Sequence, residues 1–228
     1  MNYDEVIKQL RSMGDPKNIE GMGRFGIKTE NNLGNSVTTL RNFAKKIGKN
    51  HDLAVKLWDS GIRDARMVAA CIEDPTTVSE DQVDNWVKDF DSWDICDHCC
   101  GHLIDKTPFA YKKAKEWTQR KEEFQKRAGF SLMAWLAVHD KKTDDPEFEG
   151  FLTIIKKEST DERNYVRKAV NWALRNIGKR NITMNKKAIE ISKEIQKIDS
   201  KTARWIASDA IRELASEKIQ EKVRKISK

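Results

Sequence analysis

The sequence predicts an all-α, helical-repeat solenoid, and three observations lead to this prediction. Apolar residues recur with the 3.6-residue period of a helix from one end of the chain to the other. Glycine (11) and proline (4) are scarce among 228 residues, whereas all-β folds need more turn residues. The connections between helical segments are short, which favours antiparallel helix pairs stacked into a solenoid of HEAT type with a concave basic face.

Turn-forming and capping residues set the boundaries of the expected helices. Gly61, Pro75, Pro108 and Pro146 interrupt the apolar pattern, and Ser79 precedes acidic residues as a helix N-cap does. The only Gly-rich stretch, residues 21–32, is expected to be a loop, and it matches no phosphate-binding motif. Helices are therefore expected over residues 2–13, 34–48, 51–59, 62–73, 79–90, 92–104, 108–118, 121–140, 146–158, 161–179, 184–197, 200–214 and 216–226.

The composition limits the class of protein. No strict internal repeat and no linker can be read, so one domain is expected over residues 1–228, with a globular helical bundle as the structural alternative. No apolar run reaches the ~18 residues of a membrane span, and the N-terminus is amphipathic rather than a signal peptide. Three of the four cysteines lie in one short segment, which rules out a disulfide framework between distant parts. A cytoplasmic monomer is expected.

Charge is distributed unevenly along the chain. Residues 1–105 carry 13 Lys and Arg against 18 Asp and Glu, a net −5, while residues 106–228 carry 30 against 18, a net +12. A strongly basic half favours an anionic partner such as nucleic acid. The alternative is a set of solvated, lysine-rich helix faces without a partner.

The segment Ser92–Cys100 combines residue types that are unusual on one helix. Helical spacing places Trp93, Cys96, Asp97 and Cys100 on one face, so the Asp97 carboxylate lies on an otherwise apolar stripe. A carboxylate there loses hydration unless it is paired or lines a groove. The two interpretations are an Asp paired with a neighbouring helix and an Asp that belongs to a functional site.

The same segment suggests a metal site through its cysteines and histidines. Zinc sites usually combine two half-sites from separated segments, and no second cysteine pair is present. We therefore expect no metal and no cofactor, with the thiols packed as small apolar groups. The residues weighed here as metal ligands are Cys96, His98, Cys99, Cys100 and His102.

The basic half contains a second unusual helix face. Lys168, Trp172, Arg175 and Lys179 follow helical spacing on a stripe separate from the apolar one. A Trp among cations suits a phosphodiester backbone, although the next repeat could instead cover it. Trp205, by contrast, is expected in the core.

Three segments resemble one known family in order and approximate spacing. Trp93-Asp94-Ile95-Cys96-Asp97, Lys126-Arg127-Ala128 and the stretch from Arg167 to Arg175 are similar to motifs of the AlkD-like DNA alkylation repair family of HEAT-like repeat glycosylases. The resemblance extends from about residue 20 to 215. Glu30 replaces a proline that often follows the Phe25–Thr29 segment.

This resemblance implies a DNA glycosylase that hydrolyses the N-glycosidic bond of N3- or N7-alkylated purines in duplex DNA. Asp97 would be the catalytic carboxylate, Trp93 and Trp172 aromatic walls, and Arg127 a phosphate contact. Lys168, Arg175 and Lys179 would also bind DNA. A catalytically silent paralogue that binds DNA structures and a HEAT-type protein scaffold are the alternatives.

Overall fold

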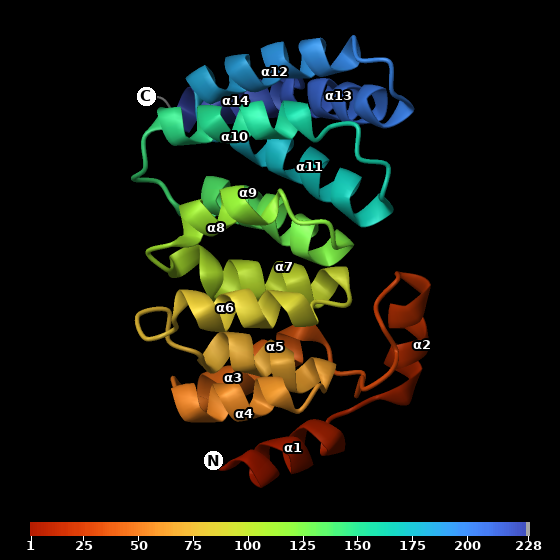
Figure 1. Ribbon diagram of the computed structural model, residues 1–228, viewed down its shortest axis with the longest axis vertical. Coiled ribbons are helices and arrows are strands. Elements are labelled where there is room, and N and C mark those ends of the chain that lie inside the picture. The colour runs from red at the N-terminus through yellow and green to blue at the C-terminus, as the bar shows by residue number, and fades with distance from the viewer. Residues whose placement is uncertain (227–228) are drawn as a thin grey trace. The chain divides into compact units, whose positions relative to one another are not determined.

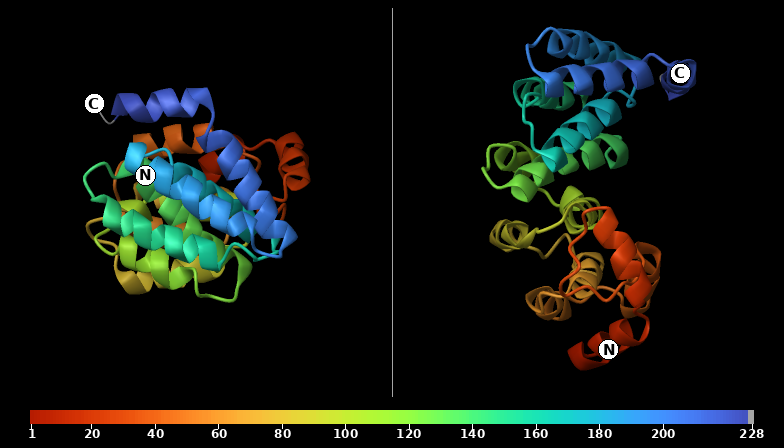
Figure 2. Two further views of the ribbon diagram at one scale, coloured as in Figure 1. Left: turned by 90° about the horizontal axis from the view of Figure 1, so that it is seen from above. Right: turned by 90° about the vertical axis from the view of Figure 1, so that its right-hand side faces the viewer.

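The computed structural model describes residues 1–226, and within them it contains helices and no strands (Figures 1 and 2). The all-α prediction is confirmed. Two short 3-10 turns, η1 (Val87–Asp89) and η2 (Ile104–Lys106), follow α6 and α7. The α-helices are α1 (Tyr3–Ser12), α2 (Pro16–Arg24), α3 (Val37–Ile47), α4 (His51–Asp59), α5 (Arg63–Ile72), α6 (Glu80–Trp86), α7 (Trp93–His102), α8 (Ala110–Trp117), α9 (Glu123–His139), α10 (Asp145–Lys157), α11 (Asn164–Ile177), α12 (Ile182–Gln196), α13 (Lys201–Leu214) and α14 (Glu217–Ile226).

The chain forms two compact units, of which the first spans Met1–Phe109. Within it α3 and α4 both pack on α5, and α5 packs on α7. The indole of Trp58 is fully buried and stacks on Trp86, with ring centroids 4.1 Å apart. Helix α7, which carries the unusual Trp–Asp segment, is positioned by its packing on α5.

The second unit begins at Ala110 and repeats the same kind of packing. Helices α9, α11 and α13 form one row, in which each packs on the next, while α10 packs on α12 and α12 on α13. Trp117, Phe130, Phe148 and Phe151 are fully buried between these helices. The row places α11 between α9 and α13, so its side chains contact both neighbours.

Hydrogen bonds between successive helix pairs reveal a repeat length that differs between the units. In the first unit the partners are often 31 positions apart, as where the Trp58 indole donates to Asp89 at 2.8 Å. In the second they are often 38 apart, as where Asn171 donates to Asp209 at 2.8 Å. Because the two lengths differ, no single period is visible in the sequence.

Helix α2 is the one element that the sequence analysis missed. The Asp15 carboxylate caps it by accepting a hydrogen bond from the Lys17 amide (3.0 Å), and Pro16 occupies its first turn. None of its residues is buried, so it lacks the apolar stripe on which the other predictions relied. The expectation of a loop over residues 21–32 is wrong for its first four residues.

The structure does not test two further predictions about the architecture. These are the concave basic face and the single domain over residues 1–228, and both stay predictions. No helix in the described part of the chain is long and apolar enough to cross a membrane.

Candidate functional site

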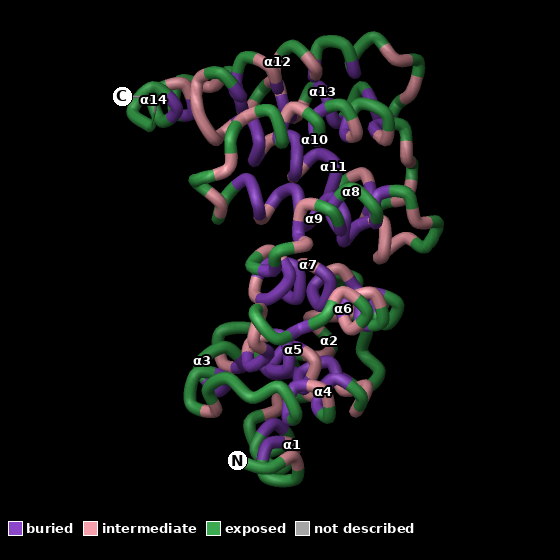
Figure 3. The backbone as a smooth tube through the Cα atoms, turned by 60° about the vertical axis from the view of Figure 1, so that its left-hand side comes forward, coloured by how far each residue is buried: buried purple, intermediate pink, exposed green. Residues whose placement is uncertain are grey.

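Most of helix α7 is buried (Figure 3). Trp93 and Asp97 are among its few residues that reach solvent. These two residues are half-exposed and lie one helical turn apart on the same face. Cys96 and Cys100, which spacing alone put on the same stripe, are completely buried. The solvent-accessible part of α7 therefore presents an indole and a carboxylate side by side.

The Trp93 indole is held in place by the segment that follows α2. Its Nε1 donates a hydrogen bond to the carbonyl of Phe25 at 2.9 Å, and nearby Lys28 pairs with Asp91 at 3.2 Å. The Phe25 side chain itself is 74% exposed. An exposed aromatic beside Trp93 is a candidate DNA contact that sequence reasoning missed, because residues 21–32 were assigned to a loop without chemistry.

The two carboxylates of the Trp-Asp-x-x-Asp segment have different surroundings. Asp94 is buried and accepts hydrogen bonds from Arg63 Nε (2.7 Å), Ser92 Oγ (2.6 Å) and the Ile95 amide (2.9 Å). Such a fully bonded carboxylate stabilises the start of α7 and its packing on α5. Asp97 is half-exposed one turn later, so it is the carboxylate of the pair that a ligand can approach.

The cysteines of this helix are free thiols packed in the core. Cys96, Cys99 and Cys100 are all buried, and burial raises the pKa values of Cys99 and Cys100 well above the ordinary thiol value. His98 lies 3.0 Å from the Met67 carbonyl and 3.3 Å from Cys71 Sγ. Among residues 1–226, no cluster of three His, Cys, Asp or Glu side chains is arranged to hold a metal ion.

The basic stripe of α11 is largely paired with acids of α13. Arg175 and Lys179 both form ion pairs with Glu213, the latter at 2.7 Å. Lys168 is exposed and makes no ion pair with a described residue. The assignment of Lys168, Arg175 and Lys179 as DNA contacts stays a prediction.

Trp172 is half-exposed and supported from one side by other rings. It meets Trp135 edge-on, with centroids 5.4 Å apart, and Trp135 in turn stacks on His139 at 4.8 Å. Its neighbour Asn171 is buried and donates to Asp209. The indole is therefore accessible to solvent on one side and held by Trp135 on another. Its role as an aromatic wall stays a prediction.

Arg127 lies inside the junction between α9 and α11. Its side chain is buried, and Nη1 donates to the Tyr165 carbonyl at 2.6 Å. This bond ties the two helices together in the structure. A phosphate contact by Arg127, which the family resemblance implies, stays a prediction.

The prediction that Trp205 belongs to the core is wrong. Its side chain is 41% exposed, and the Arg167 guanidinium lies over its ring at 5.4 Å. Ile206, Ala207 and Ala210 form the buried face of α13, so Trp205 falls just beyond the edge of that face. Spacing alone did not distinguish adjacent positions at the boundary of an apolar stripe.

Each unit thus contains some of the predicted site residues. The first unit holds Trp93 and Asp97 on one face of α7, and the second holds Trp172, Lys168 and Arg175 on α11 and Lys179 just after it. The fold and these side chains define a helical-repeat protein of HEAT-like type. The chain belongs to the family of DNA alkylation repair enzymes, whose model matches residues 6–214.

Individual relatives and a solved structure are also similar to this chain. The uncharacterized proteins Lin0241 of Listeria innocua and Lmo0209 of Listeria monocytogenes are 24% and 23% identical over 202 residues, which cover 87% of this chain and 88% of each relative. A solved structure from "a new family of proteins related to the HEAT-like repeat DNA glycosylases with affinity for branched DNA structures" has a TM-score of 0.78 and 22% identity, covering 93% of this chain and 95% of its own. This likeness confirms the helical-repeat fold.

Proposed function

We propose that this protein is a DNA glycosylase that excises cationic N3- and N7-alkylated purines from duplex DNA. The observation that carries the proposal is one face of α7, where a half-exposed Asp97 follows Trp93 by one turn on a helix that is buried except for these two residues and His102. The same helix buries its three thiols and the His98 imidazole, so the accessibility of Trp93 and Asp97 distinguishes these two side chains from most of their neighbours. Membership in the DNA alkylation repair family supports the same conclusion.

The chemistry requires few groups because the substrate is already activated. An alkylated purine that carries a positive charge leaves without protonation by a general acid. The deoxyribose then develops oxocarbenium character, which a nearby carboxylate stabilises electrostatically. Asp97 supplies that carboxylate and can orient the attacking water, while the Trp93 ring adds cation–π attraction to the developing charge. The proposed reaction uses no metal or cofactor.

DNA binding is assigned to side chains on both units. Phe25, whose carbonyl is bonded to Trp93, offers an exposed ring for stacking on a base, and Lys168 offers an exposed cation for a phosphate. Trp172 is proposed as a second aromatic wall and Arg127, Arg175 and Lys179 as further phosphate contacts. These assignments follow the family resemblance and are tested separately from the chemistry.

A second candidate function is recognition of DNA structure without excision. The solved structure of similar fold belongs to proteins with affinity for branched DNA, which supports this alternative. Ion pairing of Arg175 and Lys179 with Glu213 also lowers the positive charge available to a regular duplex. In this case the protein would bind junctions more tightly than duplexes and leave alkylated bases in place.

One pair of measurements separates the two candidates. Purified protein is incubated with duplex DNA containing N7-methylguanine, and released base and abasic sites are quantified against a no-enzyme control. Affinities for a four-way junction and a duplex of equal length are measured in parallel. The glycosylase proposal predicts enzyme-dependent release; tight junction binding with release at the spontaneous rate would favour the structure-binding alternative.

A further inference from the structure

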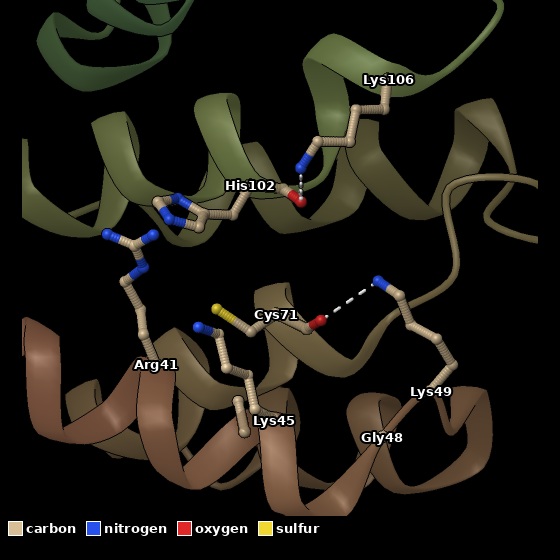
Figure 4. Close-up of a pocket in the computed structure, with 8 residues that line it drawn as sticks. Arg41, Lys45, Gly48, Lys49, Cys71, His102 and Lys106 are labelled. Carbon is tan, nitrogen blue, oxygen red and sulfur yellow. Dashed lines mark hydrogen bonds between the residues drawn. The ribbon is translucent and has the colours of Figure 1, made fainter.

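A second site candidate lies in the first unit, on another side of α7. A cavity of about 280 Å³ opens between α3, the end of α5 and the segment that joins α7 to η2 (Figure 4). His102, which borders it, follows Trp93 by nine residues, and this spacing puts the two side chains on opposite faces of α7. The polar and charged side chains that line the cavity are Arg41, Lys45, Lys49, Cys71, His102 and Lys106.

Within residues 1–226, none of the four cations around the cavity forms a close ion pair with a carboxylate, although Asp74 and Glu73 act on Lys49 from a longer distance. Lys49 Nζ donates to the backbone carbonyls of Cys71 (3.1 Å) and Glu73 (2.6 Å), and Lys106 Nζ donates to that of His102 (2.7 Å). Carbonyl oxygens orient an ammonium group without neutralising it. Arg41 and Lys45 are exposed and form no hydrogen bond or ion pair within residues 1–226. Positive charge therefore accumulates around one small volume.

Repulsion between cations contributes to the electrostatics of Lys49. Burial, followed by the charge of Lys106, lowers the pKa of the Lys49 ammonium group. An anion placed in the cavity would relieve that repulsion. Elsewhere the protein pairs many of its cations: Lys126 contacts Glu158 at 2.6 Å, and Lys156 contacts Glu194 at 2.6 Å.

We propose that this cavity binds a phosphate monoester group. Duplex phosphodiesters carry single charges spaced along an extended backbone, so a groove with rows of cations suits them. A phosphate monoester instead concentrates about −1.5 to −2 charges on one group at neutral pH. Four cations around one cavity match that compact anion, and the ligand is either a free mononucleotide or the 5′-phosphate end of a DNA strand. The proposal goes beyond glycosylase activity and does not depend on it.

Cys71 provides a reporter at the wall of the cavity. It is partly exposed, whereas the other three cysteines are buried, so a neutral alkylating reagent should modify Cys71 selectively. Labelling by iodoacetamide at mildly alkaline pH is followed by mass spectrometry with increasing inorganic phosphate or adenosine 5′-monophosphate. Potassium chloride of equal ionic strength is the control for the general screening of charges by salt. Saturable protection by phosphate or the nucleotide, absent with chloride, is the expected result.

Two matched variants place the effect at the cavity. Lys45→Gln removes a cation that lines it, while Lys46→Gln removes the adjacent exposed lysine of α3, which does not. Loss of one charged hydrogen-bond donor should raise the half-protection concentration about tenfold in the first variant and leave it nearly unchanged in the second. Equal effects of both substitutions, or no protection beyond that of chloride, would overturn the proposal.

The source of the phosphate is distinguished with two oligonucleotides of identical sequence. If the ligand is a strand end, a 5′-phosphorylated oligonucleotide should protect Cys71 at lower concentration than its 5′-hydroxyl counterpart, and Lys45→Gln should abolish the difference. If the ligand is a free nucleotide, the mononucleotide should protect and the two oligonucleotides should behave alike. Equal protection by both oligonucleotides with none from the mononucleotide or phosphate would contradict a monoester site.

Discussion

At the scale of single residues, Phe25 shows most directly how an exposed apolar group points to a partner. Its ring is 74% exposed while its carbonyl accepts the hydrogen bond from the Trp93 indole, so the backbone that carries this ring is tied to the candidate site. Stacking of a base on such a ring contributes about 1–3 kcal/mol. Phe25→Ala should therefore weaken DNA binding about tenfold without changing the melting temperature.

The control for this prediction is Val37→Ala, which shortens another exposed apolar side chain of the same unit. Affinities for an alkylated duplex are compared by fluorescence anisotropy, and melting temperatures by circular dichroism. Equal affinity of the wild type and the Phe25 variant would show that this ring does not contact DNA.

At this scale the sequence indicated which residues share a helix face, but it did not indicate how deeply each of them is buried. Helical spacing grouped Trp93 and Asp97 with Cys96 and Cys100, and the structure separates them, because the cysteines are fully buried and the other two are half-exposed. On a helix with neighbours around most of its circumference, an apolar stripe does not show which edge meets solvent. The same limit explains why Trp205 was assigned to the core.

At the scale of elements, α7 has a pH sensitivity that its burial creates. Burial, together with the nearby His102, lowers the pKa of His98 to about 3. The unfolded chain binds this proton near pH 6.5 and the folded chain does not, so stability is complete above that value and falls as pH drops toward 3. The expected slope is at most about 1.4 kcal/mol per pH unit from this group.

This prediction is checked by urea unfolding at several pH values between neutral and mildly acidic. His98→Gln keeps a hydrogen-bond donor for the Met67 carbonyl but replaces the buried ring, so it should lower stability at neutral pH. Because glutamine does not titrate, the same variant should show a smaller loss of stability as the pH falls. His139→Gln, on a helix of the second unit, serves as the control. An unchanged slope in the His98 variant would contradict the assignment.

The contact between α11 and α13 leads to a prediction of the opposite kind, a gain in binding. Burial alone would raise the pKa of Glu213, but hydrogen bonds from Lys179 and Arg175 outweigh it and lower the pKa, so Glu213 is ionised when it holds these cations. Glu213→Gln should free Lys179 for phosphates and loosen Arg175, which keeps a longer ion pair with Asp209 at 3.6 Å. Affinity for duplex DNA should rise several-fold, and its salt dependence should steepen by roughly 0.9 in log–log slope for each added contact.

The matched control is Glu194→Gln, which removes a carboxylate paired with Lys156 on other helices of the same unit. Its effect on affinity should be small, because Lys156 is not among the proposed DNA contacts. If both variants gain equally, the change reflects net charge alone, and Arg175 and Lys179 are not specific contacts.

At the scale of the whole molecule, the fold class was readable from the sequence and the repeat was not. Twelve or more short helices with apolar stripes predicted an all-α repeat protein, which the structure and the solved structure of similar fold confirm. The repeat lengths of 31 and 38 positions appear only in hydrogen bonds such as Arg63 to Asp94 and Lys187 to Glu149. Divergent repeats keep the packing of neighbouring helices but no common sequence period.

For the candidate site, too, some features could be predicted from the sequence and others could not. Family motifs identified Trp93, Asp97 and Trp172, which are all accessible in the structure, whereas the pairing of Arg175 and the burial of Arg127 depend on partners 38 positions away. Phe25 was missed because α2 has no buried face from which a helix could be predicted. Motifs therefore predicted the candidate side chains, and tertiary contacts determined which of them are accessible.

The central claim is that the Asp97 carboxylate carries the excision chemistry, and one substitution tests it. Single-turnover release of N7-methylguanine is measured for the wild type, Asp97→Asn and the control Asp81→Asn, which alters an exposed carboxylate on α6. Asparagine keeps the shape of the side chain and removes the charge that would stabilise the oxocarbenium ion. The account predicts a loss of about 10²-fold or more for Asp97→Asn, with DNA affinity, helical content and the Asp81 variant nearly unchanged. Wild-type release rates in a folded Asp97→Asn protein would contradict it.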